Sequence, residues 1–339
     1  MKIAPTASAL VLMFSVAACL DSRSGSLESD THTADTRPDT TSPEVDTGSE
    51  DDTGFEDDTT PDTTATQDTG DTSPSLDTTP IVFSIVSSAE SDTVVPQTRV
   101  YLSSQGLPDG AVAYRWSAIQ PEGSVSTFQP SAFVANPTFE LNVAGVYTFI
   151  LEVLDGDGQV LGTARYTMSA VPVSDLHISL TWQTPNDPDE TNTGNDAGSD
   201  LDLHLLRTDL GATWFDPAHD IFWDSPGGAA PDGSPRPSLD RDDTDGGGPE
   251  NINFTSSGGG TYAVGVHYWA SHGYGSSFAT VRIYVRGQLV EEWANVELED
   301  RELWHSHHID MTGADIVVTR VGGGNPVIEV YNPPDYFQP

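Results

Sequence analysis

The sequence contains a single cysteine, few basic residues and no hydrophobic run long enough to cross a bilayer. Cys19 is the only cysteine among 339 residues, so no disulfide can form within the chain. Lys and Arg together number 13, against 52 Asp and Glu, and the formal net charge is -39. A surface this negative repels phosphate backbones. We therefore exclude nucleic acid as a partner and expect divalent cations and basic partners to be favoured.

The N-terminal apolar stretch is short. It follows Lys2 and runs from about Ala7 to Ala18, whereas a membrane-spanning helix needs about 20 apolar residues. A basic residue, a short apolar segment and small residues before a cysteine are typical of an export signal. The sequence therefore predicts a signal peptide at residues 1–18.

The end of this segment, VAAC, resembles a bacterial lipobox. The resemblance implies cleavage before Cys19 and lipidation of that residue, which would anchor the chain to a membrane. Leu20 stands where an aspartate would retain a lipoprotein in the inner membrane of enteric bacteria, which favours the outer membrane. We expect a cell-envelope lipoprotein, facing either the periplasm or the cell surface. An ordinary signal peptide followed by a chance cysteine is the alternative.

Residues 19–80 consist mostly of Asp, Thr, Ser, Gly, Glu and Pro. They have no apolar period and cannot bury a core, and their like charges extend the chain. We predict a disordered acidic tether that holds the folded part away from a membrane.

Residues 81–172 are rich in Val, Tyr, Phe and Thr and are interrupted by turn signals such as LPDG and DGDG. No long stretch has a helical period, and short strands at this spacing predict an antiparallel sandwich. In the segment GVYTFILEV, which begins at Gly145, the alternate residues from Tyr147 to Val153 are expected to face the core.

YRWSAIQPEGSVSTFQPS, followed by PTFELNVAGVYTFILEVLDGDG, resembles a PKD or related immunoglobulin-like module of bacterial surface proteins. Tyr114 and Trp116 fit its Tyr-x-Trp strand, although IQPEGS replaces the usual turn rich in Gly and Asp. The resemblance implies an immunoglobulin-like sandwich, in which Tyr147 has the position of a tyrosine corner.

The sequence predicts a second sandwich at residues 173–321. Residues 322–339 are expected to form a C-terminal tail, with a terminal strand followed by an irregular end. A long irregular section is expected between Gly211 and Phe254, and such connections are usually functional or held by a specific contact. The predicted fold class is all-β, with two antiparallel β-sandwich domains after the disordered tether. The expected strands of the second are LHISLTW, DLDLHLLR, GTYAVGVHYW, SFATVRIYV, QLVEEWA, RELWHSHHID and ADIVVTR.

Acidic residues gather in two stretches of this second region. In SDLDLHLL, the aspartates point to one side of a strand whose leucines face a core. In SLDRDDTDGGGPENINF, four aspartates and a glutamate flank three glycines. Calcium takes about six to eight oxygen ligands in irregular geometry, which suits such loops better than the octahedral demand of magnesium. If the two stretches meet, the predicted shell of a structural calcium ion is Asp200, Asp202, Asp240, Asp242, Asp243, Asp245 and Glu250.

The acidic run does not match a known calcium loop, and an alternative to calcium binding exists. Aligning Gly246 with the sixth position of an EF-hand places Arg241 first and Ile252 twelfth, so that motif is not matched. The aspartates could instead bond to the turn backbone and contact water.

His305 and His307 are expected to share a strand face, but their spacing matches no zinc motif.

Aromatic residues cluster in TWFDPAHDIFWDSP. Their rings could stack on sugar faces, or they could pack the long loop onto its own domain. No Gly-x-Ser-x-Gly or His-Glu-x-x-His motif is present, so we expect no enzymatic activity. The candidate ligand-stacking residues are Trp214, Phe215, Phe222 and Trp223.

Four ordered segments together resemble a module of bacterial exported proteins, the YfaP-type uncharacterised domains. They are LTWQTPNDPDETNTGNDAGSDLDLHLL, SLDRDDTDGGGPENINF, GTYAVGVHYW and ATVRIYVRGQLV. With the preceding PKD-like domain on a lipidated tether, the chain is similar to predicted surface lipoproteins of myxobacteria-like bacteria. The resemblance implies a secreted β-sandwich and no established activity.

We therefore expect a non-catalytic binding or structural role, as a calcium-stabilised adhesion or surface-display module with a protein or glycan partner. The alternative is a carbohydrate-binding module or an accessory domain of an envelope hydrolase.

Overall fold

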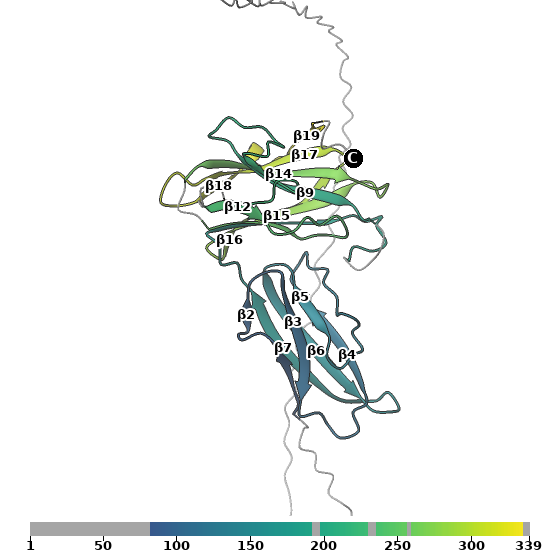
Figure 1. Ribbon diagram of the computed structural model, residues 1–339. Coiled ribbons are helices and arrows are strands. Elements are labelled where there is room, and N and C mark those ends of the chain that lie inside the picture. The colour runs from purple at the N-terminus through teal and green to yellow at the C-terminus, as the bar shows by residue number, and fades with distance from the viewer. Residues whose placement is uncertain (1–81, 192–196, 230–234, 256–258, 335–339) are drawn as a thin grey trace, which may run out of the picture. The chain divides into compact units, whose positions relative to one another are not determined.

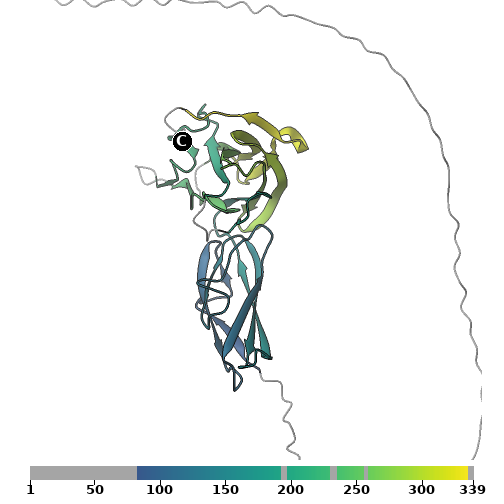
Figure 2. The same cartoon turned by 90° about the vertical axis from the view of Figure 1, so that its right-hand side faces the viewer.

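The computed structural model describes residues 82–191, 197–229, 235–255 and 259–334. Their regular structure consists of β-strands and one short 3-10 turn, η1 (Val321–Gly324), as Figure 1 and Figure 2 show. The predicted all-β fold class is confirmed. None of the described residues belongs to a helix long and apolar enough to span a membrane. The predicted signal peptide, Cys19 and the tether lie outside the described residues.

The N-terminal sandwich consists of a three-stranded sheet and a four-stranded sheet. The strand orders are β1-β3-β5 and β2-β7-β6-β4, and every pair is antiparallel except β2 and β7, which are parallel. The strands are β1 (Ser84–Ser87), β2 (Thr93–Val94), β3 (Thr98–Gln105), β4 (Ala113–Ile119), β5 (Thr138–Leu141), β6 (Gly145–Leu154) and β7 (Val160–Ala170).

Strand β6 carries much of the core of this sandwich. Tyr147, Phe149, Leu151 and Val153 are buried, and the residues between them are partly exposed, as the period of two predicted. The Tyr147 hydroxyl donates to the Val143 carbonyl at 2.9 Å and accepts from the Val143 N–H at 3.0 Å. The predicted tyrosine corner is therefore present, and it fixes the turn before β6.

The C-terminal sandwich also has two antiparallel sheets. One has the order β10-β9-β14-β17-β18, with β19 also pairing with β17, and the other has the order β11-β12-β13-β8-β15-β16. Alternate apolar residues such as Leu180, Leu203 and Val264 form the core. The strands are β8 (Leu176–Gln183), β9 (Asp200–Arg207), β10 (Asp220–Ile221), β11 (Gly227–Ala229), β12 (Pro235–Leu239), β13 (Glu250–Phe254), β14 (Thr261–Ala270), β15 (Ser277–Val285), β16 (Gln288–Leu298), β17 (Glu302–Asp310), β18 (Val317–Arg320) and β19 (Val327–Val330).

One segment differs from the sequence expectation. The section expected to be irregular contains β13, which pairs with β12 and β8 and sends Ile252 and Phe254 into the core. The alternation in ENINF is that of a strand, but it is only five residues long. Strand β19 pairs with β17, in the C-terminal segment where a terminal strand was expected.

A β-bulge at Ser306 places two histidines differently from the prediction. The register of β14 and β17 shifts there, so that Val264 faces His307 while Gly265 faces His305. His305 contacts the ring of Trp214 at 5.5 Å, whereas His307 contacts the core residue Trp293 at 5.8 Å. The expected shared face of His305 and His307 is therefore wrong, because the extra residue of the bulge reverses the alternation.

Candidate metal centre

Strand β9 is buried on both of its faces. Leu201, Leu203 and Leu205 enter the core, and the alternating Asp200, Asp202 and His204 face the other way. Strand β14 pairs along one edge of β9, but β10 covers the other edge only at Leu205 and Leu206. The first half of β9 therefore offers backbone groups to the 240–250 loop.

Glu250 fastens this loop to β9. Its carboxylate is fully buried and accepts hydrogen bonds from the Leu203 N–H at 2.8 Å and the Asp243 N–H at 3.0 Å. Glu250 thus satisfies an N–H on the open edge of β9 and another within the loop. Because the same side chain bonds to both segments, their relative position is fixed before any ion is considered.

The three glycines of the loop allow it to pass close to β8. The Trp182 N–H donates to the Gly247 carbonyl at 3.1 Å. A Cβ atom on Gly247 would lie 2.7 Å from the Trp182 carbonyl oxygen. Gly248 has a φ of 82°, and a Cβ atom there would lie 2.8 Å from the Trp182 ring. Larger residues would therefore push the loop away from the sandwich.

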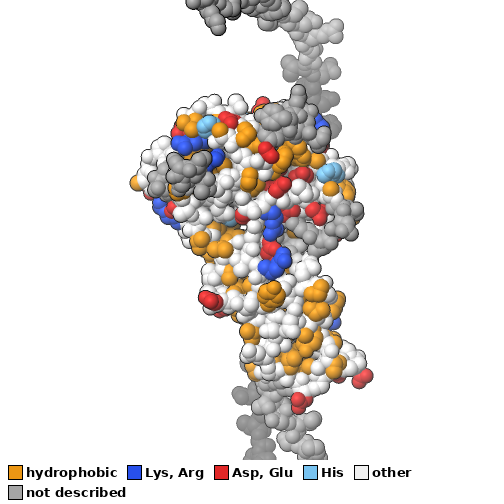
Figure 3. Space-filling model, in the orientation of Figure 1, with side chains coloured by type: hydrophobic (Ala, Val, Ile, Leu, Met, Phe, Trp, Pro, Cys, Tyr) orange, Lys and Arg blue, Asp and Glu red, His pale blue; other side chains and the backbone are white. Residues whose placement is uncertain are grey.

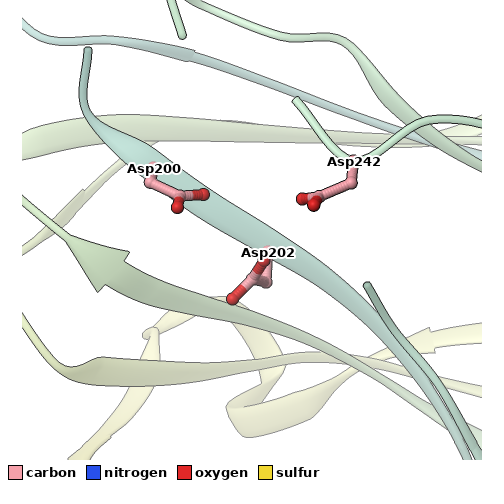
Figure 4. A group of neighbouring side chains, drawn as sticks. All are labelled: Asp200, Asp202 and Asp242. Carbon is pink, nitrogen blue, oxygen red and sulfur yellow. The ribbon is translucent and has the colours of Figure 1, made fainter. Parts of the chain in front are cut away.

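Asp242 is brought opposite the aspartates of β9 by these contacts. Oxygen atoms of Asp200, Asp202 and Asp242 all lie within 4.8 Å of one another. Figure 4 shows Asp200 and Asp202 on one strand, with Asp242 facing them from a separate loop. Asp200 and Asp202 are 7% and 2% exposed, whereas Asp242 is open to solvent. The two acidic stretches therefore meet.

The carboxylates of this cluster are electrostatically unfavourable without a cation. Burial, followed by the charges of Asp202 and Asp242, raises the pKa of Asp200 well above its usual value. Burial also raises the pKa of Asp202, and it raises the pKa of Glu250 beside them. One oxygen of Asp200 and one of Asp202 are buried without a hydrogen-bond partner among the described residues. Such groups are costly unless a proton or a metal ion offsets them.

The donor set fits a hard divalent cation. Three carboxylates supply oxygen ligands only, which is the preference of calcium and magnesium, and the two unpaired oxygens are available to an ion. The His267 Nδ1 lies 3.9 Å from the Asp202 Oδ2, too far for a hydrogen bond. The chain therefore holds an aspartate cluster able to bind a metal ion.

The other predicted ligands have different surroundings. Asp240 accepts a hydrogen bond at 3.1 Å from the N–H of Asn251, which lies in β13. Asp243 is buried and lies 3.9 Å from Arg241. Asp245 approaches Gly198, where a Cβ atom would lie 3.1 Å from its Oδ1. Of the seven predicted ligands, the structure brings together three, with Glu250 supporting them.

Three of the four candidate stacking residues are covered by protein. Trp214, Phe215 and Phe222 are 8%, 1% and 0% exposed. Phe222 stacks on His204 at 5.3 Å, and Trp214 packs over Gly265, where a Cβ atom would lie 2.9 Å from the ring. These three rings cannot accept a sugar, because the loop packs onto its own sheet. Trp223 is half-buried and keeps part of its surface in solvent.

Sequence reasoning missed the polar groups beneath the loop that carries Trp214 and Phe222. The His204 Nδ1 lies 2.8 Å from the Asp220 Oδ2, and the same oxygen accepts from the Phe215 N–H at 2.8 Å. His267 faces Asp202 in the register of β9 and β14. The alternation of β9 already placed His204 beside Asp202, but only the strand pairing identifies His267, and nothing in the sequence identifies Asp220.

No family model matches the chain, and none of the curated proteins matches its sequence. Among solved structures, the type II cohesin dyad from the adaptor ScaA scaffoldin of Acetivibrio cellulolyticus is similar at 7% sequence identity. The match covers 61% of this chain and 94% of that chain, with a TM-score of 0.17. A likeness of this degree carries no argument about function, and the fold class rests on the strands and sheets themselves.

Proposed function

We propose that the C-terminal sandwich is a calcium-binding module and that its role is non-catalytic. One observation carries the proposal: carboxylate oxygens of Asp200 and Asp202 on a strand and of Asp242 on a loop lie within 4.8 Å of one another, and one oxygen each of Asp200 and Asp202 is buried without a partner among the described residues. An ion at this position bonds β9 to the loop that carries Asp242. It stabilises the native sandwich, since it binds a site that the unfolded chain lacks.

Calcium suits this site better than magnesium. Magnesium demands a near-ideal octahedron at about 2.0–2.1 Å, whereas calcium accepts irregular shells at about 2.3–2.6 Å. Here the positions of the carboxylates follow from sheet pairing, from the bonds of Glu250 and from the packing of Gly248 on Trp182. A set of ligands fixed by such independent contacts favours the ion with the less strict geometry.

The N-terminal segment supports a place in the cell envelope. The lipobox-like VAAC sequence, the single cysteine and the acidic tether together favour a chain anchored by lipid at Cys19. We infer that the tether presents the sandwiches as an adhesion or display module of an outer-membrane lipoprotein.

Calorimetric titration with calcium tests the binding proposal. The full chain, stripped of ions with EDTA, is expected to bind one calcium ion and to bind magnesium at least tenfold more weakly. Asp202→Asn and Asp242→Asn are expected to weaken calcium binding at least tenfold, since each removes a charged ligand. The matched control is Asp157→Asn, an exposed turn residue of the N-terminal sandwich, which should bind as the wild type does. The absence of calcium binding to the wild type would overturn the proposal.

A further inference from the structure

Two half-buried tryptophans lie on the same face of the sheet as the metal cluster. Trp223 follows β10, and Trp269 is the extra residue of a bulge in β14, between Tyr268 and Ala270. Their ring centroids are 5.5 Å apart, with an interplanar angle of 65°. Both rings belong to the aromatic cluster over β9 and β14 and keep part of their surface in solvent.

The tryptophan pair is joined to the metal cluster by direct neighbours. The Trp269 ring contacts His267 at 5.9 Å, and the His267 Nδ1 lies 3.9 Å from the Asp202 Oδ2. Ala270, next in the chain, pairs with Asp200. A bound ion and the rings of Trp223 and Trp269 would thus flank one stretch of the sandwich surface. In Figure 3, acidic and hydrophobic side chains lie side by side on this sandwich, in the upper part of the view.

Each ring of the tryptophan pair packs on a buried phenylalanine. Trp223 meets Phe222 edge-on at 6.2 Å, and Phe222 stacks on the buried His204 at 5.3 Å. Trp269 contacts Phe215 at 6.4 Å, and Phe215 stacks on Tyr331 at 5.7 Å. A ligand would meet rings whose rotamers are already fixed, so binding costs little side-chain entropy.

The metal cluster leaves part of an ion's shell open. Three aspartates supply at most about six oxygens, and fewer if any of them binds through one oxygen, whereas calcium takes about six to eight. Asp242 is exposed, so the cluster is open to solvent on the side of this residue. Pairs of hydroxyl groups are neutral oxygen donors that can fill such positions.

The charge of the chain selects the class of ligand. A net charge of -39 repels anionic polymers before they reach the site. A neutral polyol is not repelled, and the flat apolar face of a sugar ring suits a tryptophan surface. Neutral carbohydrates therefore meet both requirements, with oxygen donors on one side and an apolar face on the other.

We propose that the calcium ion and the Trp223–Trp269 pair form one carbohydrate-binding site. Vicinal hydroxyls of a neutral sugar complete the calcium shell, and an adjacent sugar face packs on the tryptophans. This inference rests on the proposed calcium site, which it extends from a structural ion to an ion that contacts the ligand.

The test is binding of the full chain to an array of neutral oligosaccharides, in calcium and in EDTA. The wild type is expected to bind at least one neutral oligosaccharide in calcium and to lose that binding in EDTA. Trp223→Ala and Trp269→Ala are each expected to weaken binding at least tenfold in calcium. Trp269→Phe, which keeps an aromatic face, is expected to retain most of it. Tyr101→Ala is the matched control, because Tyr101 is an exposed ring of the N-terminal sandwich, and it should bind as the wild type does.

Calcium titration of each variant separates the possible failures. If the wild type binds no calcium, both the proposed function and this inference fail. If calcium binds but no neutral oligosaccharide does, or if binding persists in EDTA, the inference alone is overturned. It is also overturned if the tryptophan variants bind calcium and sugar as the wild type does. If one alanine variant fails to bind calcium, its loss of sugar binding is not counted. The inference is then overturned if the other alanine variant, measured beside Trp269→Phe, binds sugar as the wild type does.

Discussion

The burial of Asp202 depends on residues that are distant from it in the sequence. The alternation of β9 predicted that Asp202 points away from the core, and it does. The same alternation cannot show that the residue is only 2% exposed, because its cover comes from loops that follow in the sequence. The predicted ligand set also included Asp240, whose carboxylate accepts a hydrogen bond from the backbone of β13.

Asp202→Asn is expected to have opposite effects with and without calcium. In EDTA at pH 8, the substitution removes a buried carboxylate whose pKa is raised by burial, so the free energy of unfolding should rise by about 1–3 kcal/mol. In saturating calcium, the wild type should be the more stable of the two. Urea denaturation under both conditions measures this. A variant that is less stable than the wild type in EDTA would contradict the electrostatic account of the cluster.

His307 is expected to make the C-terminal sandwich sensitive to acid. Burial, and to a smaller extent Arg320, lowers the pKa of His307 to about 4, and within the described residues neither ring nitrogen has a partner. The unfolded pKa is about 6.5. Because the pKa of His307 is lower in the folded than in the unfolded chain, the buried neutral imidazole is compatible with full stability above pH 6.5. The free energy of unfolding then decreases as the pH falls towards 4, by up to about 3 kcal/mol.

Thermal unfolding between pH 7 and pH 4 measures the effect of His307. His307→Leu should reduce the loss of stability in this range, while the control His308→Leu, at an exposed neighbouring position, should leave it unchanged. Equal losses in the wild type and in His307→Leu would show that this imidazole does not control the acid response.

At the scale of the elements, strands were predictable where alternation was long and not where pairing was irregular. Strands β6, β9 and β14 follow clear patterns of eight to ten residues. The short β13 is set by its two neighbours, β12 and β8, rather than by its own length. The bulge at Ser306 depends on the register with β14, which no local pattern of β17 contains.

The loop between β12 and β13 is expected to depend on its glycines. In Gly248→Ala, a Cβ atom would meet the Trp182 ring at 2.8 Å, at a φ of 82° that disfavours other residues. The unfolding free energy should fall by about 1–3 kcal/mol, and calcium affinity should fall with it, because Asp242 lies on this loop. Gly156→Ala is the control, with open space around its Cβ position. Denaturation and calcium titration check both effects, and unchanged calcium affinity would contradict the role assigned to the loop.

For the whole molecule, composition predicts the division into an acidic N-terminal segment and two sandwiches, and contacts between distant residues decide the rest. The change of composition near Ile81 marks the start of the described β-structure. Composition could not show that the acidic stretches around Asp200 and Asp242 meet. That outcome follows from the packing of β13 against β9 across the two sheets, and from the bonds of Glu250 at the start of β13.

Cys19→Ser is expected to release the whole protein from the membrane fraction. The substitution removes the thiol that would carry the acyl chains, while the rest of the chain is unchanged. Fractionation of bacteria expressing the full chain, together with labelling by a fatty-acid analogue, measures this. Ser22→Ala is the control and should stay labelled and membrane-bound. A wild-type chain that carries no label would contradict the lipid anchor.

A crystal structure grown with calcium, with anomalous scattering used to identify the ion, tests the proposed metal centre directly. A calcium ion bound as proposed gives an anomalous peak between Asp200, Asp202 and Asp242, with calcium–oxygen distances of about 2.3–2.6 Å. A map with no peak at this position, in crystals that contain saturating calcium, would contradict the proposal.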